Sequence, residues 1–104
     1  MRDEFPILVA ARFIVVGPAE AGFLPRLLAP FARRDLTPDT VRAHRQGAVI
    51  RAEIHLTMPR DELHLVAGNL GQIVGVSRVE SMEGRVVALR VNPTVAEPAE
   101  RLIA

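Results

Sequence analysis

One segment, residues 7–16, constrains the fold most, because it is apolar on both faces of an extended strand. Its odd-numbered and even-numbered residues fall on opposite faces, and all of them except Arg12 are apolar. A strand with two apolar faces lies inside its sheet and is covered by neighbours. The segment therefore predicts an interior strand, and it is too short to span a bilayer.

Residues 21–34 predict the first helix. Apolar residues recur there at spacings of three and four, the pattern of an amphipathic helix: Phe23, Leu24, Leu27, Leu28 and Phe31. Gly17 and Pro18 are expected to end the preceding strand. Arg33 and Arg34 suit the negative end of the helix dipole.

Residues 40–45 and 48–58 flank Gln46-Gly47 and predict a β-hairpin, since glycine can take the positive φ of a tight turn. A two-residue loop at 46–47 would pair Arg45 with Ala48 and Val41 with Ala52. In that register one face would be buried: Val41, Ala43, Ile50, Ala52, Ile54, Leu56 and Met58. The other face would carry Arg42, His44, Val49, Arg51, Glu53 and His55.

Pro59, Asp61 and Glu62 are typical of a helix start. An apolar stripe follows at Leu63, Val66, Ala67, Leu70 and Ile73. Gly71 marks the end of this second helix. Residues 74–80 predict a fourth strand, and residues 85–91 predict an extra C-terminal strand after the turn signal at 83–84. Residues 92–104 predict a tail, so the domain covers residues 1–91.

The order of elements predicts an α+β fold, a ferredoxin-like βαββαβ sandwich with a four-stranded antiparallel sheet and both helices on one face. The 104 residues suffice for one domain, and 49% apolar with 24% charged residues is an ordinary globular composition. This topology hosts many functions, so function must be argued from a site.

Catalytic and metal-binding motifs are missing from the sequence. It contains no cysteine, which excludes disulfides and thiolate chemistry and fits a reducing, cytoplasmic location. The three histidines, His44, His55 and His64, lie in different predicted elements and lack metal-ligand spacing. Ser77 and Ser81 stand outside any nucleophile turn. We therefore predict a protein that is not an enzyme and needs no metal or cofactor.

Two other functions remain as alternatives, RNA binding and a small ferredoxin-like dimeric enzyme. RNA-binding modules of this topology stack bases on aromatic residues of the central strands, whereas the predicted outer rows hold Arg12, Arg51, Glu53 and His55. A net charge of +1 also gives no strong positive field. An enzyme would need an acid–base group in a cleft, and none is recognisable. We expect neither a nucleic-acid nor a membrane partner.

Residues 16–24, VGPAEAGFL, resemble the glycine loop of ACT domains, whose pattern is Asn or Asp, two variable residues, Gly, one residue and Leu. Here that window is residues 19–24. Residues 28–36, LAPFARRDL, and residues 70–79, LGQIVGVSRV, resemble segments of acetolactate synthase small regulatory subunits, as does HLTMPR at 55–60. A glycine at a strand-to-helix junction lets backbone approach a ligand, and the helix start offers N–H groups to a carboxylate.

This resemblance implies a regulatory subunit of an amino-acid biosynthetic enzyme such as acetolactate synthase, which makes branched-chain amino acids with a thiamine-diphosphate-dependent large catalytic subunit. Family members form side-by-side homodimers with one continuous sheet, paired through the first strand and first helix. A branched-chain amino acid binds between the glycine loop of one chain and the start of the second strand of the other. Carried over, the effector-binding residues are Glu20, Ala21, Gly22, Phe23, Leu24 and Thr37.

Four positions depart from the family pattern. Ala19 replaces Asn or Asp, Thr37 replaces Asn, Asp35 replaces Gly, and Pro38 replaces an apolar residue. The first two changes remove side-chain acceptors for the ammonium group of an amino acid. A buried charge without a partner costs several kcal/mol, so we expect this chain to bind free branched-chain amino acids weakly or not at all.

Overall fold

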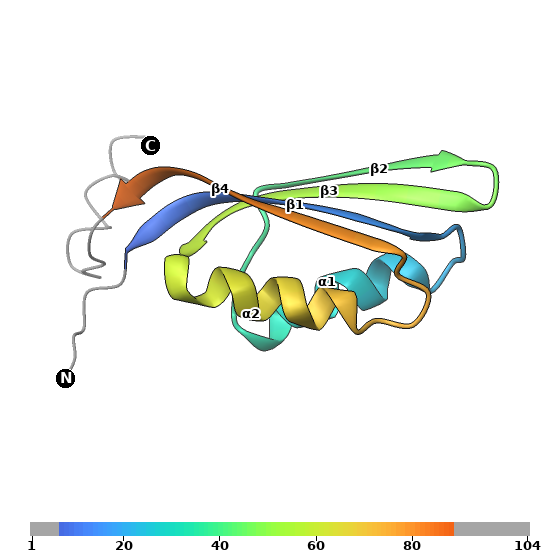
Figure 1. The fold of residues 1–104 in the computed structure, drawn as a ribbon, viewed down its shortest axis with the longest axis horizontal. Helices are drawn as coiled ribbons and strands as arrows, with labels where there is room; N and C mark the ends of the chain where they lie inside the picture. Colours follow the sequence, from blue (N-terminus) through green and yellow to red (C-terminus); the bar gives the residue numbers. More distant parts are fainter. Residues whose placement is uncertain (1–6, 89–104) are drawn as a thin grey trace, which may run out of the picture.

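The computed structural model describes residues 7–88 and has one sheet with two helices on one face (Figure 1). The elements in chain order are β1 (Leu8–Pro18), α1 (Phe23–Arg33), β2 (Thr40–Gln46), β3 (Val49–Pro59), α2 (Arg60–Gly71) and β4 (Arg78–Ala88). All strand pairs are antiparallel, in the order β2-β3-β1-β4. The predicted ferredoxin-like βαββαβ sandwich is confirmed, and the predicted tail, 92–104, lies outside the described residues.

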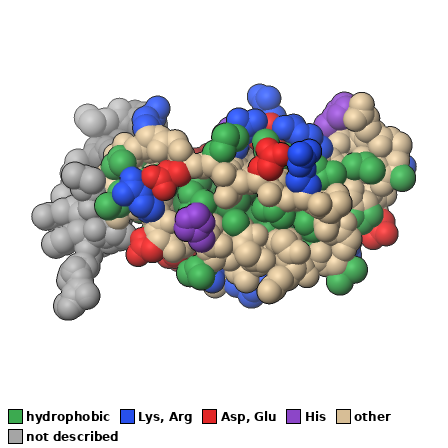
Figure 2. Space-filling model, viewed as in Figure 1, with side chains coloured by type: hydrophobic (Ala, Val, Ile, Leu, Met, Phe, Trp, Pro, Cys, Tyr) green, Lys and Arg blue, Asp and Glu red, His purple; other side chains and the backbone are tan. Residues whose placement is uncertain are grey.

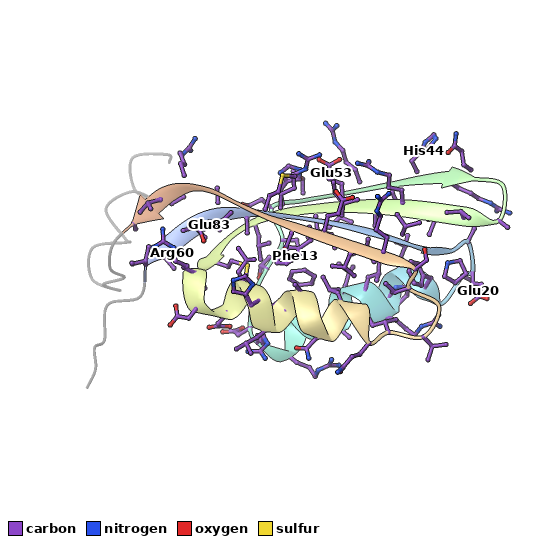
Figure 3. All side chains as sticks on the ribbon, in the orientation of Figure 1. Phe13, Glu20, His44, Glu53, Arg60 and Glu83 are labelled. Atoms are coloured by element: carbon purple, nitrogen blue, oxygen red, sulfur yellow. The ribbon has the colours of Figure 1, made fainter. Side chains whose placement is uncertain are left out.

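β1 is the interior strand, as its two apolar faces predict. It pairs with β3 on one side and with β4 on the other. The core lies between the sheet and the helices, and it is formed by Val9, Ala11, Phe13, Val15, Phe23, Leu27, Phe31, Ala52, Ile54, Leu56, Met58, Leu63, Val66 and Leu70. Phe13, labelled in Figure 3, lies between the sheet and the helices, and its ring meets that of Phe31 edge to face with centroids 5.5 Å apart.

The interior position of β1 corrects the mode of dimerisation that the family resemblance implies. Both backbone edges of β1 are hydrogen-bonded within the chain, so β1 cannot pair with another copy to continue the sheet. The free edges of the sheet belong to β2 and β4. A continuous sheet across two copies would have to form at one of these strands.

The predicted break at Gly17 and Pro18 is wrong, because β1 continues through both residues opposite Ile50 and Val49. Pairing with β4 already ends at Val16. Proline has no N–H to donate, and at Pro18 no strand lies on the β4 side to need one. Gly17 instead makes room for α1. A Cβ at Gly17 would lie 2.6 Å from Cε1 of the Phe23 ring.

The C-terminus of α1 forms a Schellman motif. The N–H of Leu36 donates to the carbonyl of Phe31 at 2.8 Å, and the N–H of Asp35 donates to the carbonyl of Ala32 at 3.0 Å. This arrangement places Asp35 in the left-handed region at φ 59°. Glycine is the usual residue there, which explains physically why the family pattern has Gly at this position.

The hairpin between β2 and β3 forms with a register different from the predicted one. Its loop is Gly47-Ala48, and Gln46 pairs with Val49. Gly47 has φ 62° in the first loop position, as in a type II′ turn, whereas the prediction places glycine second. The shift moves each residue by two partner positions, so the faces of β3 are unchanged and Ala52, Ile54, Leu56 and Met58 are buried as predicted.

β2 is not part of the core, contrary to prediction. All seven of its residues are exposed, including Val41 and Ala43. The strand lies at the edge of the sheet, and the tip of the hairpin extends past the helices (Figure 1). Alternation along a strand predicts which residues share a face, but it does not predict whether a helix covers that face.

The two predicted C-terminal strands form one strand, β4, within the described residues. Glu83 and Gly84 are not a turn. The register between β1 and β4 shifts on either side of Val9, which marks a β-bulge, and a Cβ at Gly84 would lie 3.1 Å from the carbonyl oxygen of Ala10. Glycine is therefore a bulge residue here. Residues 89–91 of the predicted extra strand lie outside the described range.

α2 matches its prediction in part: Pro59 is the N-cap and not the first helical residue, and two members of the predicted stripe, Ala67 and Ile73, are only half-buried, with Ile73 beyond the end of the helix. It begins directly after Pro59, carries Asp61 and Glu62 in its first turn and ends at Gly71. Its buried stripe consists of Leu63, Val66 and Leu70. Neither helix in residues 7–88 is long and apolar enough to cross a membrane.

Candidate functional site

The predicted effector loop connects β1 to α1 and lies beside the turn of the β2–β3 hairpin. The N–H of Ala19 donates to the carbonyl of Ala48 at 2.9 Å. Glu20, Ala21 and Gly22 are exposed. The next two residues differ: Leu24 is half-buried, and Phe23 is fully buried with its ring against Gly17. The side chain of Phe23 thus belongs to the core.

Three backbone N–H groups in the loop and at the helix start have no backbone acceptor among the described residues: those of Ala21, Gly22 and Leu24. The N–H of Phe23 already donates to the carbonyl of Glu20 at 3.0 Å, and Pro25 has no N–H. Among the described residues, the first three positions of α1 leave the N–H of Leu24 alone without a backbone acceptor. The Glu20 carboxylate lies 3.6 Å from Arg26 Nη2 and forms an exposed ion pair with it. Glu20, which follows Ala19 in the chain, is therefore already paired with a cation.

Thr37 lies at the opposite end of α1 from this loop. α1 has 11 residues, a length of about 16 Å at 1.5 Å per residue. One chain therefore does not bring Thr37 close to Glu20, Ala21 and Gly22. A site that uses all of them needs a second chain, as the family resemblance implies.

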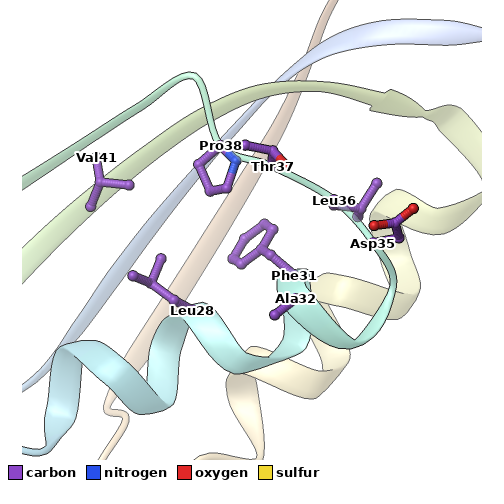
Figure 4. A pocket seen from close by; sticks show the side chains of 8 residues that line it. All are labelled: Leu28, Phe31, Ala32, Asp35, Leu36, Thr37, Pro38 and Val41. Atoms are coloured by element: carbon purple, nitrogen blue, oxygen red, sulfur yellow. The ribbon is translucent and has the colours of Figure 1, made fainter.

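A groove of about 430 Å³ surrounds Thr37, between the C-terminal half of α1 and the start of β2 (Figure 4). Its walls are mainly apolar, and its lining side chains are Leu28, Phe31, Ala32, Asp35, Leu36, Thr37, Pro38 and Val41. Except for Thr37, these residues were missed as candidates. The spacing of Leu28 and Phe31 in the sequence predicts a buried helix face. Part of that face is open to solvent because β2 lies at the edge of the sheet, which the spacing does not reveal.

The face of the sheet opposite the helices carries charged side chains, as the predicted outer rows indicate (Figures 2 and 3). The register places eight ionisable residues there: Arg12, Arg42, His44, Arg51, Glu53, His55, Arg78 and Glu80. The predicted pair of histidines shares this face without being cross-strand partners. The third histidine, His64, is exposed on α2.

Glu53 is the centre of this charged face. Its Oε2 lies 2.9 Å from Arg12 Nε and 2.8 Å from His55 Nε2, and its Oε1 lies 3.7 Å from Arg51 Nη1. The hydrogen bond from His55 and the charges of the two arginines hold the pKa of the Glu53 carboxyl below its ordinary value of 4.5. Glu53 is therefore ionised at neutral pH.

Residues 7–88 contain no group of three or more acidic, histidine or cysteine side chains that could hold a metal ion. The three phenylalanines of this range, Phe13, Phe23 and Phe31, are all buried, so the charged face offers no aromatic platform for bases.

No protein-family model and no curated protein matches the sequence. Solved structures do match. The ACT domain of GTP pyrophosphokinase from Chlorobium tepidum superimposes with a TM-score of 0.64 and 17% identity over 72% of this chain and 99% of that domain. The C-terminal domain of the MgtC protein from Mycobacterium tuberculosis gives 0.61 and 20%, covering 81% and 94% of the two chains.

An uncharacterized protein from Thermotoga maritima also matches, with a TM-score of 0.62 and 15% identity over 75% of this chain and 99% of that one. At these identities the likeness establishes the fold, which is that of ACT domains. It does not bear on the resemblance to acetolactate synthase subunits.

Proposed function

We propose that this chain is a non-catalytic regulatory domain of the ACT type that acts as a homodimer on a partner enzyme. The observation that carries the proposal is the free edge of β2 beside an apolar groove. Every residue of β2 is exposed, and Val41 leaves 43% of its surface open to solvent at the wall of the groove. A free strand edge next to apolar side chains is a surface that a second copy can cover.

β2 is a better pairing edge than β4. The bulge in β4 twists that edge and interrupts its regular spacing, a feature that blunts edge pairing. β2 has no register shift over its whole length. Antiparallel pairing of β2 with its copy would continue the sheet and bring α1 of each chain to the seam. Leu28, Leu36 and Val41 would then be covered.

Replacing Val41 with lysine is expected to dissociate the dimer. Two ammonium groups would enter the seam, and a buried unpaired charge costs several kcal/mol, so the dissociation constant should rise at least about a hundredfold. Light scattering coupled to size exclusion should show a dimer for the wild type and the 11.4 kDa monomer for the variant.

Val87→Lys is the matched control, because Val87 lies on the other edge strand with 46% exposure. This variant should remain dimeric. A monomeric wild-type chain would contradict the proposal, and dissociation by Val87→Lys but not by Val41→Lys would move the interface to β4.

Free valine, leucine and isoleucine are expected to bind weakly or not at all, even in the dimer. The N–H groups of Ala21, Gly22 and Leu24 are free to meet a carboxylate, but Ala19 offers no side-chain acceptor to the ammonium group and Glu20 is already paired with Arg26. A ligand at a hundred times its dissociation constant stabilises by about 2.7 kcal/mol, or roughly 10 °C or more for a domain of this size. Millimolar ligand should therefore leave the melting temperature unchanged, and a rise of several degrees would restore an effector sensor.

The partner that the motif resemblance suggests is a thiamine-diphosphate-dependent large subunit of the acetolactate synthase type. With little effector binding, the domain would act by stabilising that subunit. Co-purification of the two chains tests this assignment.

A further inference from the structure

The charged sheet face contains a hollow of about 330 Å³ between β2 and β3. Four charged or titratable side chains line it in two cross-strand pairs: Arg42 opposite Glu53, and His44 opposite Arg51. Paired residues of antiparallel strands have Cβ atoms about 4.5–5.5 Å apart, so these four side chains surround one small space. His44 and Glu53 both point away from the helices (Figure 3).

The hollow has an excess of positive charge. Its acid, Glu53, already contacts Arg12 and His55 through Oε2, at 2.9 Å and 2.8 Å. Arg12 and His55 themselves do not line the hollow. Arg42 has no carboxylate within ion-pair distance among residues 7–88, and Arg51 has only the longer contact to Glu53 at 3.7 Å. Because Arg12, Arg42 and Arg51 surround the single carboxylate of Glu53, the guanidinium groups exceed the carboxylate by two positive charges.

We propose that this hollow binds a phosphate dianion, held by Arg42, Arg51 and His44. A guanidinium group presents a planar fork of donors that matches two oxygens of one phosphate. Two guanidinium groups and an imidazole can together donate hydrogen bonds to the several oxygens of a tetrahedral dianion. A carboxylate has only two oxygens and would engage one guanidinium group. The ligand is either inorganic phosphate or the terminal phosphate of a small monoester.

The site is separate from the groove around Thr37. The hollow opens on the face opposite the helices, and the groove lies on the helix side of β2. The hollow is lined by one chain alone, so the phosphate proposal does not need the dimer, but pairing of β2 with its copy would place the second copy's Arg42 and His44 beside it. Hydrogen-bonded pairing holds the backbones of β2 and β3 in fixed register, so the two arginines need only side-chain adjustment to meet the ligand.

Titration of the 15N-labelled 104-residue chain with inorganic phosphate, at an ionic strength held constant with sodium chloride, tests the proposal by NMR. We expect saturable shifts at amides 42–44 and 51–53 in the millimolar range. Arg42→Gln and Arg51→Gln should each weaken binding about tenfold, the effect of losing a charged hydrogen bond. Arg42→Lys, which keeps the charge and loses the fork, should weaken it less.

Arg78→Gln is the matched control on the same face. Arg78 lies outside the hollow and pairs with Glu80 at 3.1 Å, so its loss should change the affinity less than about twofold. Parallel titration with methyl phosphate distinguishes the two ligand sources, since equal affinity assigns the site to monoesters and weaker affinity to the free anion.

Three results would overturn the proposal. The first is a response without saturation, or one that sodium chloride reproduces. The second is an equal loss of affinity in Arg78→Gln. The third is tight binding of a single-stranded RNA oligonucleotide by a chain that ignores phosphate, which would make this face a nucleic-acid surface.

Discussion

Gly17→Ala is expected to lower the free energy of unfolding by about 3 kcal/mol, the upper end of the usual range for overpacking a core. The new Cβ would lie 2.6 Å from Cε1 and 2.8 Å from Cε2 of Phe23, and closer still to Cζ. The Phe23 ring is fully buried. It cannot move without separating the first turn of α1 from β1. For a domain of this size the melting temperature should fall by about 12 °C or more.

Urea denaturation followed by circular dichroism measures this loss, and Gly22→Ala provides the control. A Cβ at Gly22 would meet only Nη1 of Arg26, at 3.1 Å, and the end of a flexible side chain can move away. That variant should stay within about 0.5 kcal/mol of the wild type. Phe23→Leu should recover part of the loss in the Gly17→Ala background, and strict additivity of the two changes would contradict the proposed clash.

The contrast between these glycines shows what the sequence motif could not distinguish. Gly22 matches the family pattern, yet a side chain fits there. Gly17 stands outside that pattern, yet the helix position requires it. A glycine inside a strand signals close approach by another group. The approaching group, Phe23, can be identified only when the angle between β1 and α1 is known.

Most of the fold could be predicted because the spacing of apolar residues in each segment matches the strand or helix that the segment forms. The two apolar faces of residues 7–16 correctly predict an interior strand, and the stripe of α2 correctly predicts its buried side. The errors arise where geometry depends on one torsion angle or one neighbour. Gly47 fits either position of a two-residue loop, and Gly84 fits a turn as well as a bulge.

The candidate site was less predictable, since it depends on which surfaces stay uncovered. Leu28 and Val41 follow core patterns, but β2 lies at the sheet edge and leaves them beside an open groove. In the same way, sequence spacing places Arg42 and Arg51 on one face without indicating that their pairing with His44 and Glu53 encloses a hollow. Cross-strand neighbours follow from register, and the register was predicted two positions away.

Phe31 connects the core to the groove, so its removal should have two consequences. The fully buried ring packs on Phe13 and also lines the groove. Phe31→Ala should cost about 4 kcal/mol of stability, as for other buried phenylalanines, and should also remove the buried floor that supports the exposed lining of the groove.

Leu27→Ala separates these two effects. Leu27 is equally buried on the same helix but does not line the groove. Leu27→Ala should lower the free energy of unfolding by about 3 kcal/mol. Chains of this variant that remain folded should still dimerise. Phe31→Leu, which retains most of the apolar volume, should stay folded and show a dissociation constant raised more than in Leu27→Ala. If the two variants dimerise equally well, the groove is not the seam. The free edge of β2 would then have to pair without help from α1.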